Sequence, residues 1–444
     1  MPRWVLLSLM GALALTLSLG LPLKTAVQPE VPVTVRVTLD GAPADALVLA
    51  LRGQTTVAVE YTDVHAPGTA RLSLSPGAYT LQVEHGAGFL ARPERRELVV
   101  RPGEPVELDV DVVRLFDPRT RGQYGVDLHT HTAVSAEATQ RIFGIPNHGD
   151  TPVDQAVGVQ LAAGLDVVFI SDHNSVAGHA RFAETAAARG APALFSEEIT
   201  TVLWGHFNPI SLNVGEGVEF GFSKTPAQFF DESRQAGATL IQVNHPYSAG
   251  FGYFFLEDRP QFDDGFQAVE AFNDHFGDDD LQTVRRLFAF WNDGRRVVAT
   301  AVSDDHFWKE LGTRYGTPRT FLLLDGPPEA AAALDALAAG RAYLSYGPLL
   351  HVEADGVGPG GTLTLQPGAL PAITAEVEAV DGLEGLTAEL VHNGAAVASV
   401  PLGGSAQRVA FAPEGLGPGW VAVRVTSSPR RYQALTNPIW LTAP

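Results

Sequence analysis

Hydrophobic and polar positions alternate with a period of two through the first part of the chain, from about residue 30 to residue 115. The clearest case is the segment 31–38, in which valines at the odd positions alternate with mostly polar residues. Turn signals such as Asp40-Gly41 and Ser75-Pro76-Gly77 separate it from further short strands at 78–83 and 106–110. Short strands divided by Gly and Pro turns predict a small β-sandwich.

The pattern changes after Asp117, where apolar strands begin to alternate with helical stretches. The expected buried strands span 126–130, 166–170, 193–195, 240–243, 268–271 and 297–302. The expected helices span 152–163, 179–189, 226–236, 281–291 and 328–339. Helices that alternate with strands in this way predict a parallel α/β layer or barrel.

From about Pro348 the chain returns to short strands and turns, which predicts a second β-sandwich. We therefore expect three parts after the N-terminal segment: a β-sandwich over 27–117, an α/β barrel over 118–347 and a β-sandwich over 348–444.

The N-terminal segment 1–26 has the pattern of a secretory signal. Arg3 is followed by an apolar, uncharged run from Trp4 to Leu23. We favour a cleaved signal peptide, with an uncleaved anchor as the alternative, because about 20 apolar residues are enough to span a bilayer. Both interpretations predict an extracytoplasmic protein that is secreted, periplasmic or held at the cell surface.

Composition narrows the classes of partner. The formal net charge of -20 argues against a nucleic-acid groove, because binding to phosphate backbones relies on Lys and Arg. The chain has no cysteine, which excludes disulfides, thiolate metal ligands and a cysteine nucleophile. We expect a small-molecule substrate, no membrane partner beyond the possible anchor, and possible docking to a surface through the β-sandwiches.

Side chains suited to metal binding stand at the ends of the expected central strands. His129 and His131 share one face of a strand because they are two residues apart. Four later strands run out into Asp172-His173, Glu197-Glu198, Asn244-His245 and Asp304-Asp305-His306, and His206 follows Glu198. One such pair alone would be an ordinary solvated strand end. Five in succession predict a metal site at the carboxyl ends of the strands.

These motifs resemble those of the polymerase and histidinol phosphatase (PHP) domain superfamily, and CehA/McbA-like metallohydrolases such as carbaryl hydrolase look closest. The motifs are Asp127-Leu128-His129-Thr130-His131, Ser171-Asp172-His173-Asn174, Gly205-His206-Phe207, Asn244-His245-Pro246 and Ser303-Asp304-Asp305-His306. The segments 343–348 and 436–438 also resemble that subgroup. The resemblance covers roughly residues 120–350 and implies a distorted (β/α)7 PHP-type barrel with two or three divalent ions.

The resemblance also implies a role for each candidate ligand. A first ion would be held by His129, His131, Glu198 and Asp304. Glu198 would bridge to a second ion held with His206 and His245, and a third ion would be held by His173 and His306. Relatives complete the third site with a His or Asp shortly after the His-x-His pair, where this chain offers Glu137, so a two-metal enzyme is an alternative. Nitrogen and oxygen ligands suit Zn, Mn or Fe equally.

The chemistry that we expect is hydrolysis by a metal-activated hydroxide. A phosphoesterase acting on phosphodiesters or phosphomonoesters is the first choice, because most of the superfamily acts on phosphoesters. The alternatives are a hydrolase of amides, carbamates or esters and a non-catalytic surface-binding protein. Asp172 or His275 is the candidate proton donor, and Asp172 is alternatively a metal ligand or a partner that orients a histidine ring.

Two further features bear on the substrate. Lys309, Arg314 and Arg319 are the candidate cationic contacts for a phosphate group. The aromatic segment 251–255 is either a flap over an apolar substrate or packing beneath a loop.

Overall fold

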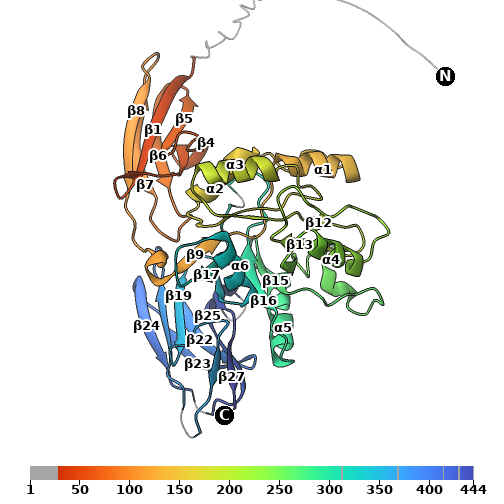
Figure 1. The fold of residues 1–444 in the computed structure, drawn as a ribbon. Helices are drawn as coiled ribbons and strands as arrows, with labels where there is room; N and C mark the ends of the chain where they lie inside the picture. The colour runs from red at the N-terminus through yellow and green to blue at the C-terminus, as the bar shows by residue number, and fades with distance from the viewer. Residues whose placement is uncertain (1–28, 312–313, 368–369, 414, 429–430, 444) are drawn as a thin grey trace, which may run out of the picture.

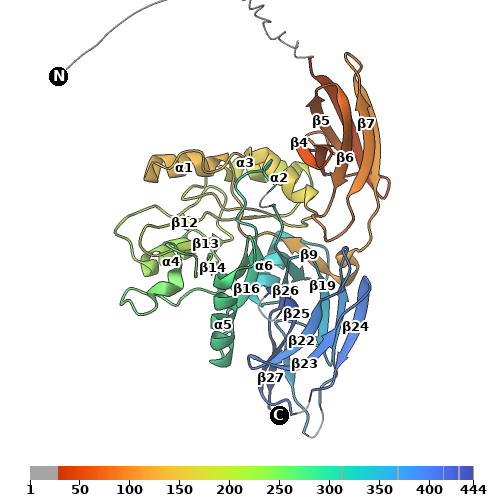
Figure 2. The ribbon, with the colours of Figure 1, turned by 180° about the vertical axis from the view of Figure 1, so that it is seen from behind.

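The computed structural model describes residues 29–311, 314–367, 370–413, 415–428 and 431–443. The expected signal or anchor at 1–26 lies outside the described residues. Figures 1 and 2 show the first strands at one end of the molecule, the last strands at the other end and most of the helices between them. None of the described helices is both long enough and apolar enough to cross a bilayer.

The N-terminal part consists of two four-stranded sheets. One contains β1 (Val31–Leu39), β2 (Ala42–Pro43), β5 (Thr69–Leu74) and β8 (Val106–Val112). The other contains β3 (Leu47–Arg52), β4 (Thr55–Tyr61), β6 (Gly77–Glu84) and β7 (Glu94–Val100). The inner faces of both sheets contribute to one apolar cluster, and the buried positions of β1 alternate as its sequence predicts.

The central part mixes helices with short strands. Its helices are α1 (Ala133–Phe143), α2 (Val153–Ala162), α3 (His179–Ala188), α4 (Pro226–Gln235), α5 (Asp278–Asn292) and α6 (Ala330–Ala338), with 3-10 turns η1 (Pro118–Arg121) and η2 (Tyr253–Leu256). Its first strands are β9 (Gln123–Val126), β10 (Val168–Ile170), β11 (Ala193–Phe195), β12 (Ile199–Thr200) and β13 (His206–Ile210). They are followed by β14 (Leu240–Val243), β15 (Ala268–Asn273), β16 (Val298–Val302), β17 (Arg319–Leu323) and β18 (Ala342–Ser345). Most expected strands and helices are present near their expected bounds, but the strand expected at 126–130 lies at 123–126, so His129 and His131 follow it; α1, β12, β13, β17 and β18 were not expected.

The described central strands do not close into the single hydrogen-bonded barrel that we expected. β10 pairs with β11, β12 to β16 form a five-stranded sheet, and β9 and β17 belong to a third sheet. Where β16 passes β17, the Thr320 hydroxyl accepts a hydrogen bond from the Ala301 N–H at 2.9 Å and donates one to the Ala301 carbonyl at 3.0 Å. A side chain thus replaces the backbone ladder at this point and separates the two sheets.

The C-terminal part shares a sheet with the centre. It contains β19 (Leu349–Ala354), β20 (Thr362–Thr364), β21 (Ile373–Glu378), β22 (Thr387–His392), β23 (Ala395–Pro401), β24 (Ala406–Phe411), β25 (Gly419–Ser428), β26 (Arg431–Thr436) and β27 (Ile439–Thr442). β19, β21 and β24 form a separate sheet of three strands. β18 pairs with β26 in antiparallel register, with Tyr343 opposite Thr436, so one nine-stranded sheet runs across residue 347.

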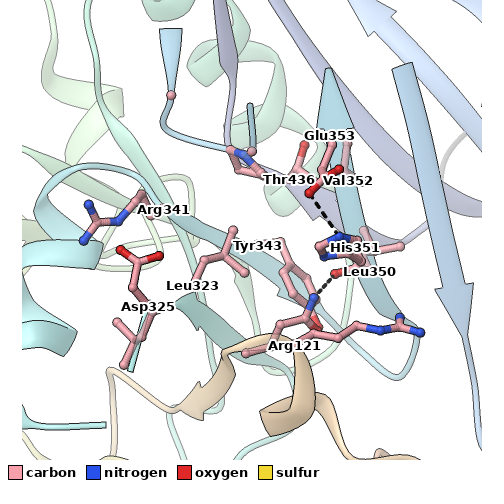
Figure 3. A pocket seen from close by; sticks show the side chains of 15 residues that line it. Arg121, Leu323, Asp325, Arg341, Tyr343, Leu350, His351, Val352, Glu353 and Thr436 are labelled. Atoms are coloured by element: carbon pink, nitrogen blue, oxygen red, sulfur yellow. Dashed lines mark hydrogen bonds and ion pairs between the residues drawn. The ribbon is translucent and has the colours of Figure 1, made fainter. Parts of the chain in front are cut away.

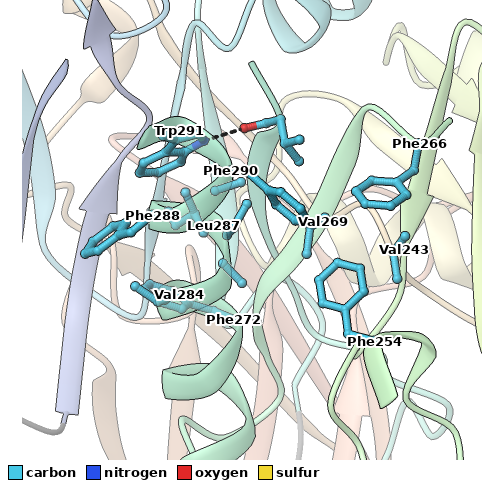
Figure 4. Packing of buried hydrophobic residues seen from close by; sticks show 14 of the residues in the cluster. Val243, Phe254, Phe266, Val269, Phe272, Val284, Leu287, Phe288, Phe290 and Trp291 are labelled. Atoms are coloured by element: carbon cyan, nitrogen blue, oxygen red, sulfur yellow. Dashed lines mark hydrogen bonds between the residues drawn. The ribbon is translucent and has the colours of Figure 1, made fainter. Parts of the chain in front are cut away.

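Helix α5 connects the central core to the C-terminal strands. Figure 4 shows Leu287, Phe290 and neighbouring side chains of α5 packed toward the apolar residues of β14 and β15. The buried Trp291 donates its indole N–H to the Val297 carbonyl at 2.8 Å, and its ring lies 5.0 Å from that of Trp420 on β25. Side chains of β14, β15, α5 and β25 therefore belong to one buried apolar cluster, which supports the ends of these strands.

A cavity of about 280 Å³ lies where β9, β18 and β19 meet (Figure 3). Gln123 donates to the Leu350 carbonyl at 2.7 Å, and His351 lies 3.4 Å from the carboxylate of Glu353. Arg121 lies 3.0 Å from each of two glutamates on β21. Arg121 and His351 of this cavity are thus paired with carboxylates, and the cavity lies apart from the predicted metal ligands.

The buried Asn437 joins the C-terminal chain to β16. Its side-chain oxygen accepts from the Ala299 N–H at 2.8 Å, and its nitrogen donates to the carbonyls of Ala299 at 3.0 Å and Ala342 at 3.2 Å. The Asn437 amide therefore satisfies both the N–H and the carbonyl of Ala299, as a neighbouring strand would. The side chain is buried, so water cannot take its place.

We predict that Asn437→Ala lowers the free energy of unfolding by about 2–4 kcal/mol, because it leaves buried backbone groups unpaired. Urea denaturation measures this loss. The exposed Asn213→Ala is the control, with an expected change of roughly 0.5 kcal/mol or less. Equal stability of the two variants would contradict the bridging role of Asn437.

Candidate metal centre

Eight of the predicted ligands lie together at the ends of the central strands. They form three groups, two of which share His131, and within each group the candidate ligand atoms lie within 4.8 Å of one another. The groups are His129, His131 and Asp304; Glu198, His206 and His245; and His131, His173 and His306. His129 and His131 follow β9, His173 follows β10, His245 follows β14, and Asp304 and His306 follow β16. Side chains from these four strand ends thus meet at one place with Glu198 and His206, as the α/β rule for ligand sites predicts.

The carboxylate of Glu198 lies at the middle of this cluster and is 1% exposed. Its Oε1 lies 2.9 Å from His206 Nδ1, 3.3 Å from His245 Nε2 and 3.3 Å from His129 Nε2. Its Oε2 lies 2.5 Å from His173 Nδ1. Burial acts to raise the pKa of Glu198, but the histidines, His206 foremost, hold that pKa well below its usual range. Oε1 therefore lies within 3.3 Å of His129, expected at the first ion, and of His206 and His245, expected at the second, which is the placement that a bridging carboxylate oxygen requires.

His129 provides a direct test of whether the cluster suits a cation. Its Nδ1 lies 2.8 Å from Glu270 Oε1, which fixes the ring. Its buried Nε2 lies 3.2 Å from Asp304 Oδ1 and 3.3 Å from Glu198 Oε1, yet has no hydrogen-bond partner among the described residues. A nitrogen that faces two carboxylate oxygens in this way fits a bound divalent ion.

The ring nitrogens of His173 and His306 lead to the same conclusion. His306 Nδ1 lies 2.8 Å from the Asp304 carbonyl and must donate to it, so its neutral ring directs a lone pair from Nε2. The Nε2 atoms of His173 and His306 face each other at 3.2 Å. Burial lowers the pKa of His306 to about 3, which disfavours a shared proton between them. A cation satisfies both lone pairs.

Ser135 and Asp172 position two of these histidines. The buried Asp172 accepts hydrogen bonds from the Thr132 N–H at 2.6 Å and from the Ser135 hydroxyl at 2.8 Å. Because that hydroxyl gives its only hydrogen to Asp172, it accepts from His131 Nδ1 at 2.9 Å and from the His173 N–H at 3.1 Å. Asp172, a candidate proton donor in the sequence, is therefore occupied in holding His131 with its Nε2 directed into the cluster.

Glu137 and His275 are not brought to the cluster. Glu137 is exposed on α1, because the helix begins at Ala133 and turns positions 135, 138 and 139 inward. The side chain of His275 is 73% exposed, lies 2.5 Å from Asp274 and lines a neighbouring cavity. The structure therefore offers no place for Glu137 in a third metal site, and it places His275 away from the ligands.

His148 and Glu270 are the functional candidates that sequence reasoning missed. His148 lies in the loop after α1, with its ring 4.2 Å from that of His306 and 4.9 Å from that of His173. The buried Glu270 holds His129 and accepts the His245 N–H at 2.7 Å. Glu270 could have been found as a carboxylate within an apolar strand, whereas the approach of His148 depends on the path of its loop.

The ligands open into a cavity of about 290 Å³ that is also lined by Phe143, Ile145 and Phe251, and we call this side its mouth because Ile145 and Phe251 are about half exposed. The three cations proposed to contact phosphate are engaged elsewhere. Lys309 pairs with Glu60 at 2.9 Å and Arg314 pairs with Glu84 at 2.6 Å. The fully buried Arg319 donates to backbone carbonyls, including that of Ala163 at 2.7 Å.

We predict that Ser135→Ala weakens metal binding by roughly 10–100-fold, because His131 and His173 lose the hydroxyl that orients them. Competition with a chromophoric chelator measures the affinity for Zn²⁺. Ser175→Ala is the matched control, since among the described residues its hydroxyl contacts only the Ala177 N–H, at 3.4 Å. Unchanged affinity in the Ser135 variant would contradict the positioning role.

We also predict that metal affinity falls with decreasing pH, by about tenfold per unit for each proton displaced. Burial acts to lower the pKa of His129, but the carboxylates of Asp304, Glu270 and Glu198 raise that pKa well above its usual value. The protonated ring cannot bind a cation, so below this raised pKa proton and metal compete. Chelator titrations between pH 6 and 8 measure the slope, with His275→Ala as the control of unchanged slope. Affinity independent of pH would contradict this account.

Comparison with known proteins gives a partial likeness. No family model matches the chain, and no curated protein matches it. A two-domain protein from Bacteroides vulgatus, described as containing a predicted PHP-like metal-dependent phosphoesterase, is 14% identical and has a TM-score of 0.42. The match covers 71% of this chain and 95% of that one.

Two further solved structures match smaller shares of the chain. A predicted metal-dependent phosphoesterase from Bifidobacterium adolescentis is 13% identical with a TM-score of 0.33, over 48% of this chain and 95% of that one. An amidohydrolase from Chromobacterium violaceum is 16% identical with a TM-score of 0.28, over 41% of this chain and 87% of that one. The structure of this protein, apart from these comparisons, establishes the mixed α/β fold and the three groups of metal-ligand candidates.

Proposed function

We propose that this protein is a metal-dependent hydrolase, with phosphoesters as its first candidate substrates. The observation that carries the proposal is the buried Glu198, whose Oε1 lies within 3.3 Å of His129, His206 and His245 at the base of an open cavity. Such a carboxylate suits two cations on either side of it. Bound cations would lower the pKa of a water molecule and stabilise the negative charge that develops during hydrolysis.

The residues assigned to the ions follow the three groups. His129, His131 and Asp304 hold the first with Glu198, and His206 and His245 hold the second with the same carboxylate. His173 and His306 begin a third position, and we assign to His148 the place that the resemblance gave to Glu137. The nitrogen and oxygen donors are compatible with Zn, Mn or Fe.

The remaining residues of the site orient these ligands. Glu270 holds His129 through Nδ1 and also accepts from the Gln242 side chain at 2.9 Å. Asn244 donates to Glu198 Oε1 at 3.1 Å and to Asn208 at 2.9 Å. These contacts fix the rings and the bridging carboxylate before substrate binds, so little reorganisation is needed during the reaction.

A hydrolase of amides, carbamates or esters is the second candidate. The observation in its favour is that Lys309 and Arg314 are paired with glutamates while Phe251 lies at the mouth of the cavity. We further propose that residues 1–26 export the enzyme and that the flanking β-sheets dock it to a surface. Neither proposal affects the chemistry of the site.

The test is an assay of the protein lacking residues 1–26 and reconstituted with Mn²⁺ or Zn²⁺. A nitrophenyl phosphodiester and monoester are compared with an aryl carbamate and an aryl ester. We expect metal-dependent phosphodiester cleavage that falls roughly 100-fold or more in Glu198→Ala, because the bridging ligand is lost. Glu137→Ala is the matched control and keeps its activity, since that side chain is exposed on α1.

The other outcomes separate the alternatives. Cleavage of the carbamate or ester alone would replace the phosphoesterase proposal with the second candidate. Absence of all four activities in a protein that retains no metal would refute the catalytic proposal and favour a surface-binding role.

A further inference from the structure

The cavity above the metal ligands has two chemically different halves. Its base consists of histidines and carboxylates, including Glu198, Asp304 and His306. Its mouth carries the apolar side chains of Phe143, Ile145 and Phe251. The metal ligands account for the base, whereas the apolar mouth has no part in binding ions.

Phe251 forms one apolar wall, directly beside a metal ligand. Its ring lies 5.2 Å from that of His206, and its side chain is 53% exposed. The backbone is held by a turn in which the N–H groups of Phe251 and Gly252 donate to the Ser248 carbonyl at 3.2 and 2.8 Å. The turn packs closely against the backbone at Gly205. A Cβ at that position would lie 2.8 Å from the Phe251 carbonyl oxygen, so a larger residue there would push the turn away. The backbone of Phe251 is therefore held beside His206, while much of the residue stays open to a ligand.

A second apolar wall comes from the end of α1. Phe143 is the last residue of the helix, and its ring meets that of Phe220 edge-on at 5.5 Å. Ile145 follows the left-handed cap Gly144, donates its N–H to the Thr139 carbonyl at 3.3 Å and is 49% exposed. Ile145 lies in the loop that leads to His148, and Phe251 lies beside His206. Both apolar walls are therefore adjacent to residues of the ligand cluster.

The charges near the mouth indicate that an uncharged group binds there. The exposed carboxylate of Asp279 lies in the lining and would repel an anion. None of the described residues that line this cavity is a lysine or an arginine. An apolar substituent gains contact with the exposed phenylalanine and isoleucine surface and meets no unfavourable charge.

We propose that the site takes a substrate in which an uncharged aromatic group lies beside the scissile bond, held between Phe251 and the wall formed by Phe143 and Ile145. This inference rests on the proposed hydrolase function and deepens it, because it names the class of substrate. Phe251 is then a residue that determines specificity and takes no part in binding the ions.

The experiment measures binding of two phosphodiesters to the metal-loaded protein by calorimetry. Dimethyl phosphate and methyl phenyl phosphate carry the same charge and differ in one aromatic ring. We expect the phenyl compound to bind at least about tenfold more tightly, since aromatic contact in a concave site is worth roughly this factor. In Phe251→Ala the advantage falls to about twofold or less, with little change for the dimethyl compound.

Phe255→Ala is the matched control. Phe255 belongs to the same segment and is 57% exposed, but its ring packs against Tyr247 at 5.4 Å and lies outside the cavity lining. This variant keeps the full preference for the phenyl compound. Equal binding of the two compounds to the unaltered protein, or an equal loss in both variants, would overturn the proposal.

Failure of the subsite can be distinguished from failure of the hydrolase function. Equal binding by a protein that cleaves phosphodiesters overturns the subsite alone. A phenyl preference that depends on Phe251 in a protein without turnover supports the subsite and counts against the hydrolase.

Discussion

A buried carboxylate that requires positive charge on both of its oxygens organises this molecule. Removing Glu198 from water is costly unless compensating charge lies beside it, and four histidines lie within 3.3 Å of its oxygens. Burial acts to lower the pKa of His129, but Asp304, Glu270 and Glu198 raise it well above its usual value, so a proton on this ring can supply positive charge beside the carboxylate. A bound cation would replace such a proton. Folding of the strand ends and binding of metal are therefore coupled through one side chain.

The strands that lead to the metal-ligand candidates belong to three separate sheets, so their ends are not fixed by one continuous backbone ladder. Side chains replace backbone pairing where the sheets separate: Thr320 serves Ala301, and Asn208 donates to the Leu128 carbonyl at 3.0 Å. These buried polar contacts are satisfied, and they fix the offsets between strands without a closed ladder. A side chain also replaces backbone pairing at the C-terminal part. Asn437 hydrogen-bonds to β16, the strand that leads to Asp304 and His306.

Much of this arrangement could be predicted from sequence because the strongest patterns are local. The alternating valines of β1 and the apolar strands that end in His or Asp indicate both the elements and the edge where they meet. Strand β12 has two residues and carries too little pattern to be predicted. Glu137 has a suitable position in the sequence for a ligand, but the first turns of α1 direct its side chain outward. His148 reaches His306 through the return of a loop, and no spacing rule in the sequence records that path.

Anomalous diffraction from crystals grown with Zn²⁺, recorded at the zinc edge, tests the central claim most directly. The account predicts strong peaks on both sides of the Glu198 carboxylate, one beside His129, His131 and Asp304 and another beside His206 and His245. The absence of zinc from this cluster in crystals that are saturated with the ion would contradict the account. Glu198 would then be stabilised by protonated histidines alone, and the site would not be a metal centre.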